Sequence, residues 1–370
     1  MKIIDVKVTV WKWDNIPPTQ YTKDFKSLDS RSTNMALVQI LTDENITGYA
    51  FMGHSMATQS YNAQLIIEKY KPGLVGKDPL DRERIWQNLS KWAMGGTMLQ
   101  IAAIDIALWD IAGKAANMPI HKLMGSYRNK VPAYASSAIL ASKEEYIDEA
   151  LSLKERGWTA YKIHPPAEPK LDIEICKAVR KAVGDDYRLM FDACWAYNYN
   201  DAIYVGQAVQ EMGFYWYEDP LVEEDIYNYK KLYSKLDIPI VSTEFIPGKY
   251  YSVPEWITQK TTNIVRGDVV AMGGISPLKR LTDLADAFNM KCEIHSGSSN
   301  SLDNVANLHV IIASTNCEFY EFFPCSGENR FGLSEEIEFD NGYVSAPNKP
   351  GLGFEIAWKD LNKTYVATIE

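Results

Sequence analysis

Three acidic residues recur along the second half of the chain, each directly after a run of apolar residues. The runs read RLMFD, FYWYE and IVSTE, and they end in Asp192, Glu218 and Glu244. The acids recur at intervals of about 26 residues, which is the length of a strand–helix unit. Clustered carboxylates repel one another unless a cation neutralises them, and oxygen ligands without Cys or His favour Mg²⁺ over Zn²⁺. The pattern therefore predicts one magnesium site, and solvated loop acids are the alternative.

Groups that can transfer protons stand at the ends of neighbouring apolar segments. Lys162 and His164 are separated by one residue, so on a strand both side chains lie on the same face. Asp268 and His295 end two later segments. An aspartate that hydrogen-bonds one imidazole nitrogen leaves the other nitrogen available as an acid or base. Together with Glu321 at the last segment, these residues predict two acid/base groups that face each other across the metal.

Short apolar segments alternate with amphipathic helices after residue 125, which is typical of a parallel sheet with helical crossovers. The expected strands cover residues 131–136, 158–164, 187–192, 214–218, 239–244, 263–269, 290–295 and 317–321. Eight such units predict an α/β fold of the TIM type, a (β/α) barrel whose active site lies at the carboxyl ends of the strands. A doubly wound sheet is the competing fold, but no GxGxxG motif follows an early strand.

The first part of the chain reads as strands followed by helices. Alternation at Val6, Val8 and Val10 predicts a half-buried strand, and its change of phase at Trp11 indicates a bulge or a strand end. A helical pattern runs through residues 101–118, with Gly113 as an interruption. We expect an α+β capping domain at 1–125, completed by a strand-like tail at about 346–370, and a barrel domain at 126–345.

Two loops of the capping domain, at 17–33 and 53–59, are expected to close over the barrel mouth and exclude water. The candidates for contact with the substrate are Tyr21, Lys23, Arg31, His54 and, as a pocket wall, Trp195. For each of them an ordinary surface role is the alternative.

The amino-acid composition disfavours some classes of binding partner and some cellular compartments. The chain has 370 residues and a net charge of −10, which disfavours nucleic acid and anionic membrane surfaces. Its five cysteines form no CxxC pair, so we expect a reducing, cytoplasmic location. The N-terminus lacks the basic and apolar pattern of a signal peptide, and no apolar run is long enough to cross a membrane.

Several stretches resemble the enolase superfamily, and within it the mandelate racemase/muconate lactonizing enzyme group. They read AYKIHPP, MFDACWAYN, YWYEDPL, IVSTE, RGDVVAMGGIS, EIHSGSS and EFYEFF. The resemblance implies a modified, enolase-like barrel and one Mg²⁺ per subunit on the three acids named above. It also implies an acid/base dyad of Asp268 and His295, with Glu321 bonded to the substrate and Lys162 as the first lysine of a Lys-x-Lys motif. Two residues depart from the pattern: His164 replaces the second lysine, and Cys194 replaces an asparagine.

The activity that this resemblance implies is Mg²⁺-dependent removal of a proton α to a carboxylate, which gives an enediolate. We predict dehydration of a sugar acid to a 2-keto-3-deoxy acid. Racemisation or epimerisation, and cycloisomerisation of a lactone, use the same intermediate and remain open. A metal-independent barrel hydrolase with paired carboxylates and a non-catalytic binding protein are the more distant alternatives. We expect a homo-oligomer, either a dimer or an octamer, that takes a small-molecule carboxylate as its substrate.

Overall fold

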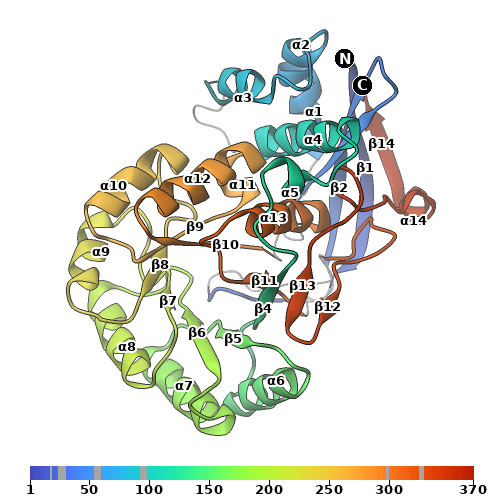
Figure 1. Ribbon diagram of the computed structural model, residues 1–370. Coiled ribbons are helices and arrows are strands. Elements are labelled where there is room, and N and C mark those ends of the chain that lie inside the picture. Colours follow the sequence, from blue (N-terminus) through green and yellow to red (C-terminus); the bar gives the residue numbers. More distant parts are fainter. Residues whose placement is uncertain (17–18, 24–30, 54–59, 92–97, 297–299, 325–328) are drawn as a thin grey trace.

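The computed structural model describes residues 1–370 except 17–18, 24–30, 54–59, 92–97, 297–299 and 325–328. Figure 1 shows an antiparallel sheet with several helices beside a ring of strands that is surrounded by further helices. Both chain termini lie at the antiparallel sheet. The expected architecture of a TIM-type barrel with an α+β cap is therefore confirmed.

The sheet of the cap contains strands from both ends of the chain. Its strands are ordered β14-β1-β2-β3, with bounds Tyr365–Ile369, Ile3–Ile16, Arg31–Thr42 and Thr47–Met52. Val6, Val8 and Val10 are buried, as their alternation predicts. The register with β14 shifts between Val10 and Trp11. The change of phase therefore marks an irregularity inside β1, after which Trp11 is buried as well and the strand continues.

The helices of the cap are α1 (Ser60–Leu65), η1 (Ile66–Tyr70), α2 (Lys71–Leu74), α3 (Arg82–Ser90), α4 (Leu99–Ala115) and α5 (Ile120–Leu123). Helix α4 of the cap lies between the cap sheet and the barrel, and the other cap helices adjoin the sheet, α4 or the barrel helices (Figure 1). Helix α4 is apolar on nearly every side because it is buried against β3 on one flank and α11 and α12 on another. The prediction that Gly113 interrupts this helix is wrong. A Cβ atom at Gly113 would lie 2.6 Å from the Cα atom of Gly351, so the glycine permits close packing within a continuous helix.

Eight strands of the described chain run parallel and form the barrel. They are β4 (Lys130–Ser136), β5 (Ala160–Ile163), β6 (Arg188–Asp192), β7 (Tyr217–Glu218), β8 (Ile240–Ser242), β9 (Ile264–Gly267), β10 (Lys291–Ile294) and β11 (Tyr320–Phe322). They pair in sequence order from β4 to β10, and β11 pairs with β4 from the other side. The hairpin of β12 (Phe339–Asp340) and β13 (Tyr343–Ser345) extends β4 in the antiparallel sense.

Helices follow the barrel strands and cover them. They are α6 (Lys143–Glu155), α7 (Pro169–Val183), α8 (Tyr199–Glu211), α9 (Ile226–Tyr233), η3 (Lys249–Ser252), α10 (Val253–Thr258), α11 (Val269–Met272), α12 (Ile275–Ala287) and α13 (Ser301–Ala313), with α14 (Trp358–Leu361) and η4 (Asn362–Thr364) near the C-terminus. Helix α9 begins at Ile226, where the side chain of Asp225 caps it by accepting from the Asn228 amide. Glu223 is thereby left in the preceding loop.

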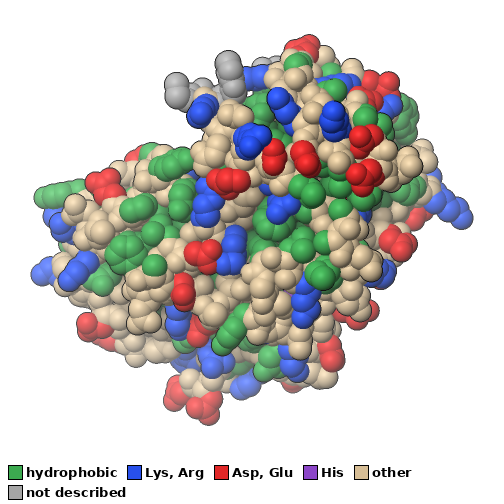
Figure 2. Space-filling model, turned by 45° about the horizontal axis from the view of Figure 1, so that its top comes forward, with side chains coloured by type: hydrophobic (Ala, Val, Ile, Leu, Met, Phe, Trp, Pro, Cys, Tyr) green, Lys and Arg blue, Asp and Glu red, His purple; other side chains and the backbone are tan. Residues whose placement is uncertain are grey.

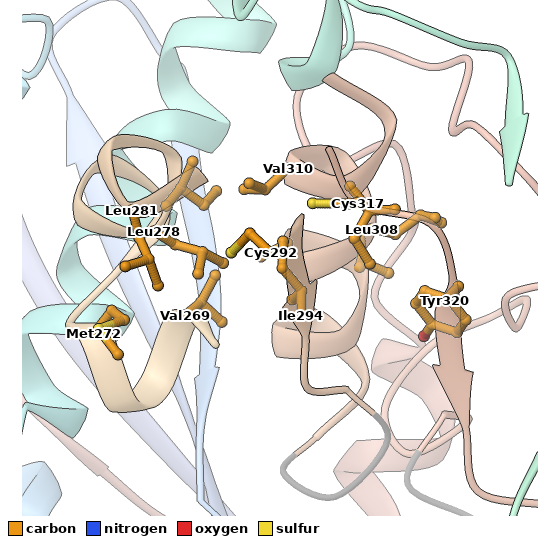
Figure 3. Close-up of a cluster of buried hydrophobic side chains, with 14 of the residues drawn as sticks. Val269, Met272, Leu278, Leu281, Cys292, Ile294, Leu308, Val310, Cys317 and Tyr320 are labelled. Carbon is orange, nitrogen blue, oxygen red and sulfur yellow. The ribbon is translucent and has the colours of Figure 1, made fainter. Parts of the chain in front are cut away.

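Two apolar layers stabilise the barrel. Outside the strands, side chains of α11, α12 and α13 pack against β10 and β11, as Figure 3 shows for Leu278, Leu281, Cys292 and Leu308. Inside, seven of the eight strand segments, all but β10, each contribute one side chain that meets the others in the centre: Tyr134, Ala160, Met190, Trp216, Val241, Ile264 and Phe319. This inner layer fills the barrel, so it forms a solid base beneath the strand ends.

The visible surface carries charged side chains of both signs, as the composition leads one to expect (Figure 2). Figure 2 shows Lys and Arg side chains interspersed with Asp and Glu over the visible face. Within the part of the chain that the structure describes, no helix has the length and apolar character needed to cross a membrane.

Gly48→Ala should destabilise the protein because β3 and α4 meet at this glycine. A Cβ atom there would lie 2.1 Å from the carbonyl oxygen of Ala107, and overpacking of this kind costs about 1–3 kcal/mol. Denaturant unfolding should show the loss. Gly73→Ala is the control, because a Cβ atom at Gly73 meets nothing within 4 Å. Equal stability of the two variants would contradict this account of the contact.

Candidate active site

Lys162 lies at the centre of the barrel mouth and contacts three carboxylates. Its Nζ atom is 2.9 Å from Asp192 Oδ2, 2.8 Å from Glu218 Oε1 and 2.7 Å from Glu321 Oε1. Burial alone would lower the pKa of Lys162, but these acids outweigh it and hold the pKa well above its ordinary value. The ammonium group is therefore a fixed positive charge.

Arg266 is a second buried cation, and it is absent from the residues predicted from the sequence. Its Nε atom is 3.0 Å from Glu244 Oε2, and its Nη2 atom is 2.9 Å from Glu218 Oε1 and 2.6 Å from Glu321 Oε2. The sequence does indicate that Arg266 belongs to the site, because it precedes Asp268 by two residues and strand residues at that spacing share a face.

The buried acids are unequally compensated by these cations. Burial opposes ionisation of Glu321, but Lys162 and Arg266 outweigh it and lower its pKa. Burial raises the pKa of Glu218 to about 8 even though Arg266 and Lys162 lie close. Burial likewise raises the pKa of Glu244 and raises that of Asp219 well above its ordinary value. The site therefore carries more carboxyl groups than its own cations keep ionised.

His164 stands at the end of β5 beside the first predicted metal ligand. Its Nδ1 atom lies 2.7 Å from the carbonyl oxygen of Ser137, so this nitrogen carries a proton and donates it. Its Nε2 atom lies 3.1 Å from Asp192 Oδ2. The rings of Tyr21 and Phe323 pack against the imidazole at centroid distances of 5.4 and 6.0 Å.

Asp268 and His295 are in contact, as expected for a dyad. Asp268 Oδ2 lies 2.8 Å from His295 Nδ1, and Glu244 Oε1 lies 3.2 Å from the same nitrogen. Burial lowers the pKa of His295, but Glu244 and the hydrogen bond that the imidazole donates to Asp268 outweigh it and raise the pKa to about 9. The buried acids thus lie between two imidazoles, with His164 beside Asp192 and His295 beside Glu244.

A cavity of about 150 Å³ opens onto these groups. Its described lining consists of Thr19, Tyr21, Thr22, Lys162, His164, Asp192, Cys194, Trp195, Asp219, Glu244, Phe245, His295 and Phe323. Residues 19–22 come from the cap, and the Ile139 amide donates to the Gln20 carbonyl at 2.6 Å. This hydrogen bond holds the cap segment against the barrel mouth. Glu218 and Glu321 are buried behind Lys162 and are not part of the lining.

The structure places two of the predicted substrate contacts at the cavity. Tyr21 and Trp195 line the cavity, and Trp195 packs edge to face on Phe245 at 5.6 Å. Lys23 instead borders a different surface hollow with Glu168 and Lys170. Arg31 begins β2, and nothing is described of its side chain. His54 lies outside the described residues.

Glu223 organises the turn that carries Glu244, and no local pattern marked it. Its carboxylate accepts the amide of Thr243 at 2.6 Å and also the amide of Phe245. Thr243 has φ = 94°, which is a rare conformation for a β-branched residue. Its hydroxyl donates to the Arg266 carbonyl at 2.9 Å. These contacts fix the backbone on both sides of Glu244, so Glu223 positions a predicted metal ligand.

The donor set suits a divalent cation. Glu218, Asp219 and Glu244 offer oxygen atoms that lie within 4.8 Å of one another, and Asp192 pairs with Glu218 in register on the adjacent strand. Asp219 Oδ1 is buried and has no hydrogen-bond partner among the described residues. Oxygen ligands of this type, with an excess of negative charge, fit Mg²⁺.

Fold and site together define a capped (β/α) barrel enzyme with a carboxylate centre between two histidines. Residues 3–125 match the family model described as mandelate racemase / muconate lactonizing enzyme, N-terminal domain. Residues 145–360 match the model described as enolase C-terminal domain-like. The chain belongs to the mandelate racemase/muconate lactonizing enzyme family of the enolase superfamily.

Relatives with known names support the same family. The chain is 28% identical to arabinonate dehydratase of Saccharolobus solfataricus over 96% of each chain. It is 30% identical to D-galactarolactone cycloisomerase of Agrobacterium fabrum, over 90% of this chain and 92% of the relative. The crystal structure of D-glucarate dehydratase from Agrobacterium tumefaciens complexed with magnesium has a TM-score of 0.89, with 33% identity over 99% of this chain and 100% of that one.

Asp268→Asn should lower the pKa of His295 below about 9, because the aspartate raises it. The folded pKa exceeds the ordinary value of 6.5, so protonation stabilises the fold fully below pH 6.5 and the contribution is lost as the pH rises through about 9. Histidine NMR titration of the metal-free protein measures the shift, with His121 as the internal control. A His295 pKa that matches the wild type would show that Asp268 does not act on the imidazole.

Glu223→Gln should weaken divalent-cation binding by about 10- to 100-fold, as loss of an orienting partner does at other metal sites. The glutamine amide cannot accept from both backbone N–H groups. Isothermal titration with Mg²⁺ measures the affinity, and saturating Mg²⁺ should recover part of any lost turnover. Glu224→Gln is the matched control, because its neighbouring side chain is exposed. Equal affinities in the two variants would mean that Glu223 does not position Glu244.

Proposed function

We propose that this protein removes the proton α to the carboxylate of a sugar acid and eliminates the β-hydroxyl, giving a 2-keto-3-deoxy acid. The observation that carries this proposal is the pair of imidazoles, His164 and His295, on either side of a buried carboxylate centre. The names of relatives support it, since arabinonate dehydratase and L-talarate/galactarate dehydratase act on sugar acids.

We infer that Asp192, Glu218 and Glu244 hold one Mg²⁺ per subunit. Bound Mg²⁺ would stabilise the negative charge that develops on the substrate carboxylate. Asp219 lies beside two of these acids, and its Oδ1 atom has no hydrogen-bond partner in the described part of the chain, which further favours a bound cation. The magnesium complex of the structurally similar D-glucarate dehydratase supports the choice of ion.

Lys162 and Arg266 are permanent positive charges near the place where negative charge develops on the substrate carboxylate. Lys162 lines the cavity and stays protonated, so its positive charge stabilises the negative charge that develops on the substrate carboxylate as the α proton leaves. Glu321 contacts both Lys162 and Arg266, and we assign it to holding them in place. The aromatic rings of Tyr21 and Phe323 cover the imidazole of His164 and exclude water from its proton transfers.

Each proton transfer has an acceptor or donor in this chain. As the α C–H bond breaks, its proton moves to one of the two imidazoles and its electron pair enters the enediolate. As the β C–O bond breaks, the departing hydroxyl takes a proton from the second acid/base group and leaves as water. The resulting enol becomes the 2-keto acid. Asp268 keeps His295 in one orientation during these steps.

A library of aldonic and aldaric acids and their lactones, assayed for 2-keto acid formation in D₂O, tests the proposal. Keto-acid formation identifies dehydration. Deuterium in recovered substrate without keto acid would identify racemisation or epimerisation, and conversion of a lactone without keto acid would identify cycloisomerisation. Turnover that survives a chelator would overturn the metal assignment and favour a hydrolase.

Glu218→Gln should bring Mg²⁺-dependent turnover below detection while the protein stays folded, because it removes a charged ligand and keeps the side-chain shape. Glu293→Gln is the control, since Glu293 is also a buried barrel carboxyl whose pKa burial raises to about 8. It accepts from the amides of Glu318 and Phe319, away from the cavity. Near wild-type activity in Glu218→Gln would refute the carboxylate centre.

We also propose that the protein is cytoplasmic and forms a dimer or an octamer. Cys176, Cys194, Cys292 and Cys317 are free thiols, which supports a reducing compartment. Light scattering on the purified chain tests the assembly. We keep residues 1–125, completed by about 346–370, as the proposed cap and 126–345 as the proposed barrel domain.

A further inference from the structure

The two departures from the family pattern lie together at one end of the cavity. Candidate ligand atoms of His164, Cys194 and Asp192 all lie within 4.8 Å of one another. The cluster of Glu218, Asp219 and Glu244 offers carboxylate oxygen alone. Imidazole nitrogen and thiolate sulfur are softer donors, and together with one carboxylate they favour zinc-like transition metals over Mg²⁺.

His164 is oriented as metal-binding histidines are. Ligating imidazoles almost always donate their second ring N–H to a backbone carbonyl or a carboxylate, and His164 Nδ1 donates to the Ser137 carbonyl at 2.7 Å. Its second ring nitrogen, Nε2, lies 3.1 Å from Asp192 Oδ2.

Cys194 lies beside His164 and Asp192. Its backbone has φ = 45°, and its amide donates to Asp192 Oδ1 at 2.9 Å. The residue lines the cavity beside His164 and Asp192. It is partly exposed, whereas Cys176, Cys292 and Cys317 are buried in the apolar core. Among the four described cysteines it is therefore the one that an ion in the cavity can reach.

We propose that His164, Cys194 and Asp192 form a second divalent-cation site that selects a zinc-like transition metal. When the metal–sulfur bond forms, the thiol S–H bond breaks and its proton goes to solvent. Asp192 belongs to this site and to the magnesium centre proposed above. Occupation of the second site therefore withdraws a ligand from Mg²⁺ and inhibits turnover, and this consequence alone rests on the proposed function.

Cobalt(II) is a direct probe, because thiolate ligation gives an intense near-ultraviolet charge-transfer band that oxygen ligation lacks. Metal-free wild type should develop the band at one Co²⁺ per chain, and Zn²⁺ should abolish it. Cys194→Ser should remove the band, and His164→Asn should weaken Co²⁺ and Zn²⁺ binding by about 10- to 100-fold. Cys176→Ala is the matched control, because that thiol is buried outside the cavity and the band should persist.

The outcomes separate this site from the proposed activity. Glu218→Gln should lose Mg²⁺-dependent turnover and keep the cobalt band, since Glu218 is not one of the three ligands. A wild type without sugar-acid turnover but with the band would overturn the proposed function and leave the second site standing. A wild type without the band, a band that survives Cys194→Ser, or Zn²⁺ affinity unchanged in His164→Asn would overturn the second site. In active enzyme, Zn²⁺ should inhibit wild type at least tenfold more strongly than Cys194→Ser, each relative to its own uninhibited rate.

Discussion

Several carboxyl groups are buried together at the mouth of the barrel, and within the described chain Lys162 and Arg266 are the permanent cations that contact them. Each of the two cations bonds Glu218 and Glu321, while Lys162 adds Asp192 and Arg266 adds Glu244. Buried carboxylates without such partners would be protonated or would destabilise the fold. The raised pKa values of Glu218 and Asp219 show that compensation is incomplete. This deficit is what makes the centre receptive to a cation.

The register of the barrel concentrates the charges. Asp192 pairs with Glu218, so the ends of β6 and β7 lie at one level, and Lys162 on β5 pairs with Met190, two residues before Asp192. The inner apolar layer sits directly beneath them. Trp216 from that layer donates its indole N–H to Glu218 Oε2 at 2.9 Å, and the Tyr134 ring lies 5.6 Å from the Lys162 ammonium. The base of the barrel thus orients the polar groups above it.

The residues of this site that could be predicted are those that stand in a recognisable local sequence pattern. Asp192, Glu218 and Glu244 each end an apolar run, so a barrel topology suffices to bring them to one ring. Asp219 and Glu223 carry no comparable signal, because their contacts depend on strand neighbours and on loop geometry, and Arg266 is marked only by its spacing of two residues from Asp268. The difference between Tyr21, which lines the cavity, and Lys23, which does not, depends on how the cap segment rests on the barrel. Alternation in β1 was predictable, but the reason for Gly113 in α4 was not, because it lies in a contact with Gly351 far along the chain.

Backbone strain links the packing of the barrel to its chemistry. Cys194, Trp195, Asp219 and Thr243 have φ values of 45°, 62°, 41° and 94°, and all four adjoin or line the carboxylate centre. Such conformations cost on the order of 1–3 kcal/mol each and persist only when the surroundings determine them. Glu223 and the Arg266 backbone hold Thr243, and the Asp219 carbonyl accepts the Trp195 amide at 2.7 Å. The apolar layers in turn hold the strands that carry these groups. The stability of the core is therefore what allows the mouth of the barrel to keep acids, thiol and imidazole in one strained arrangement.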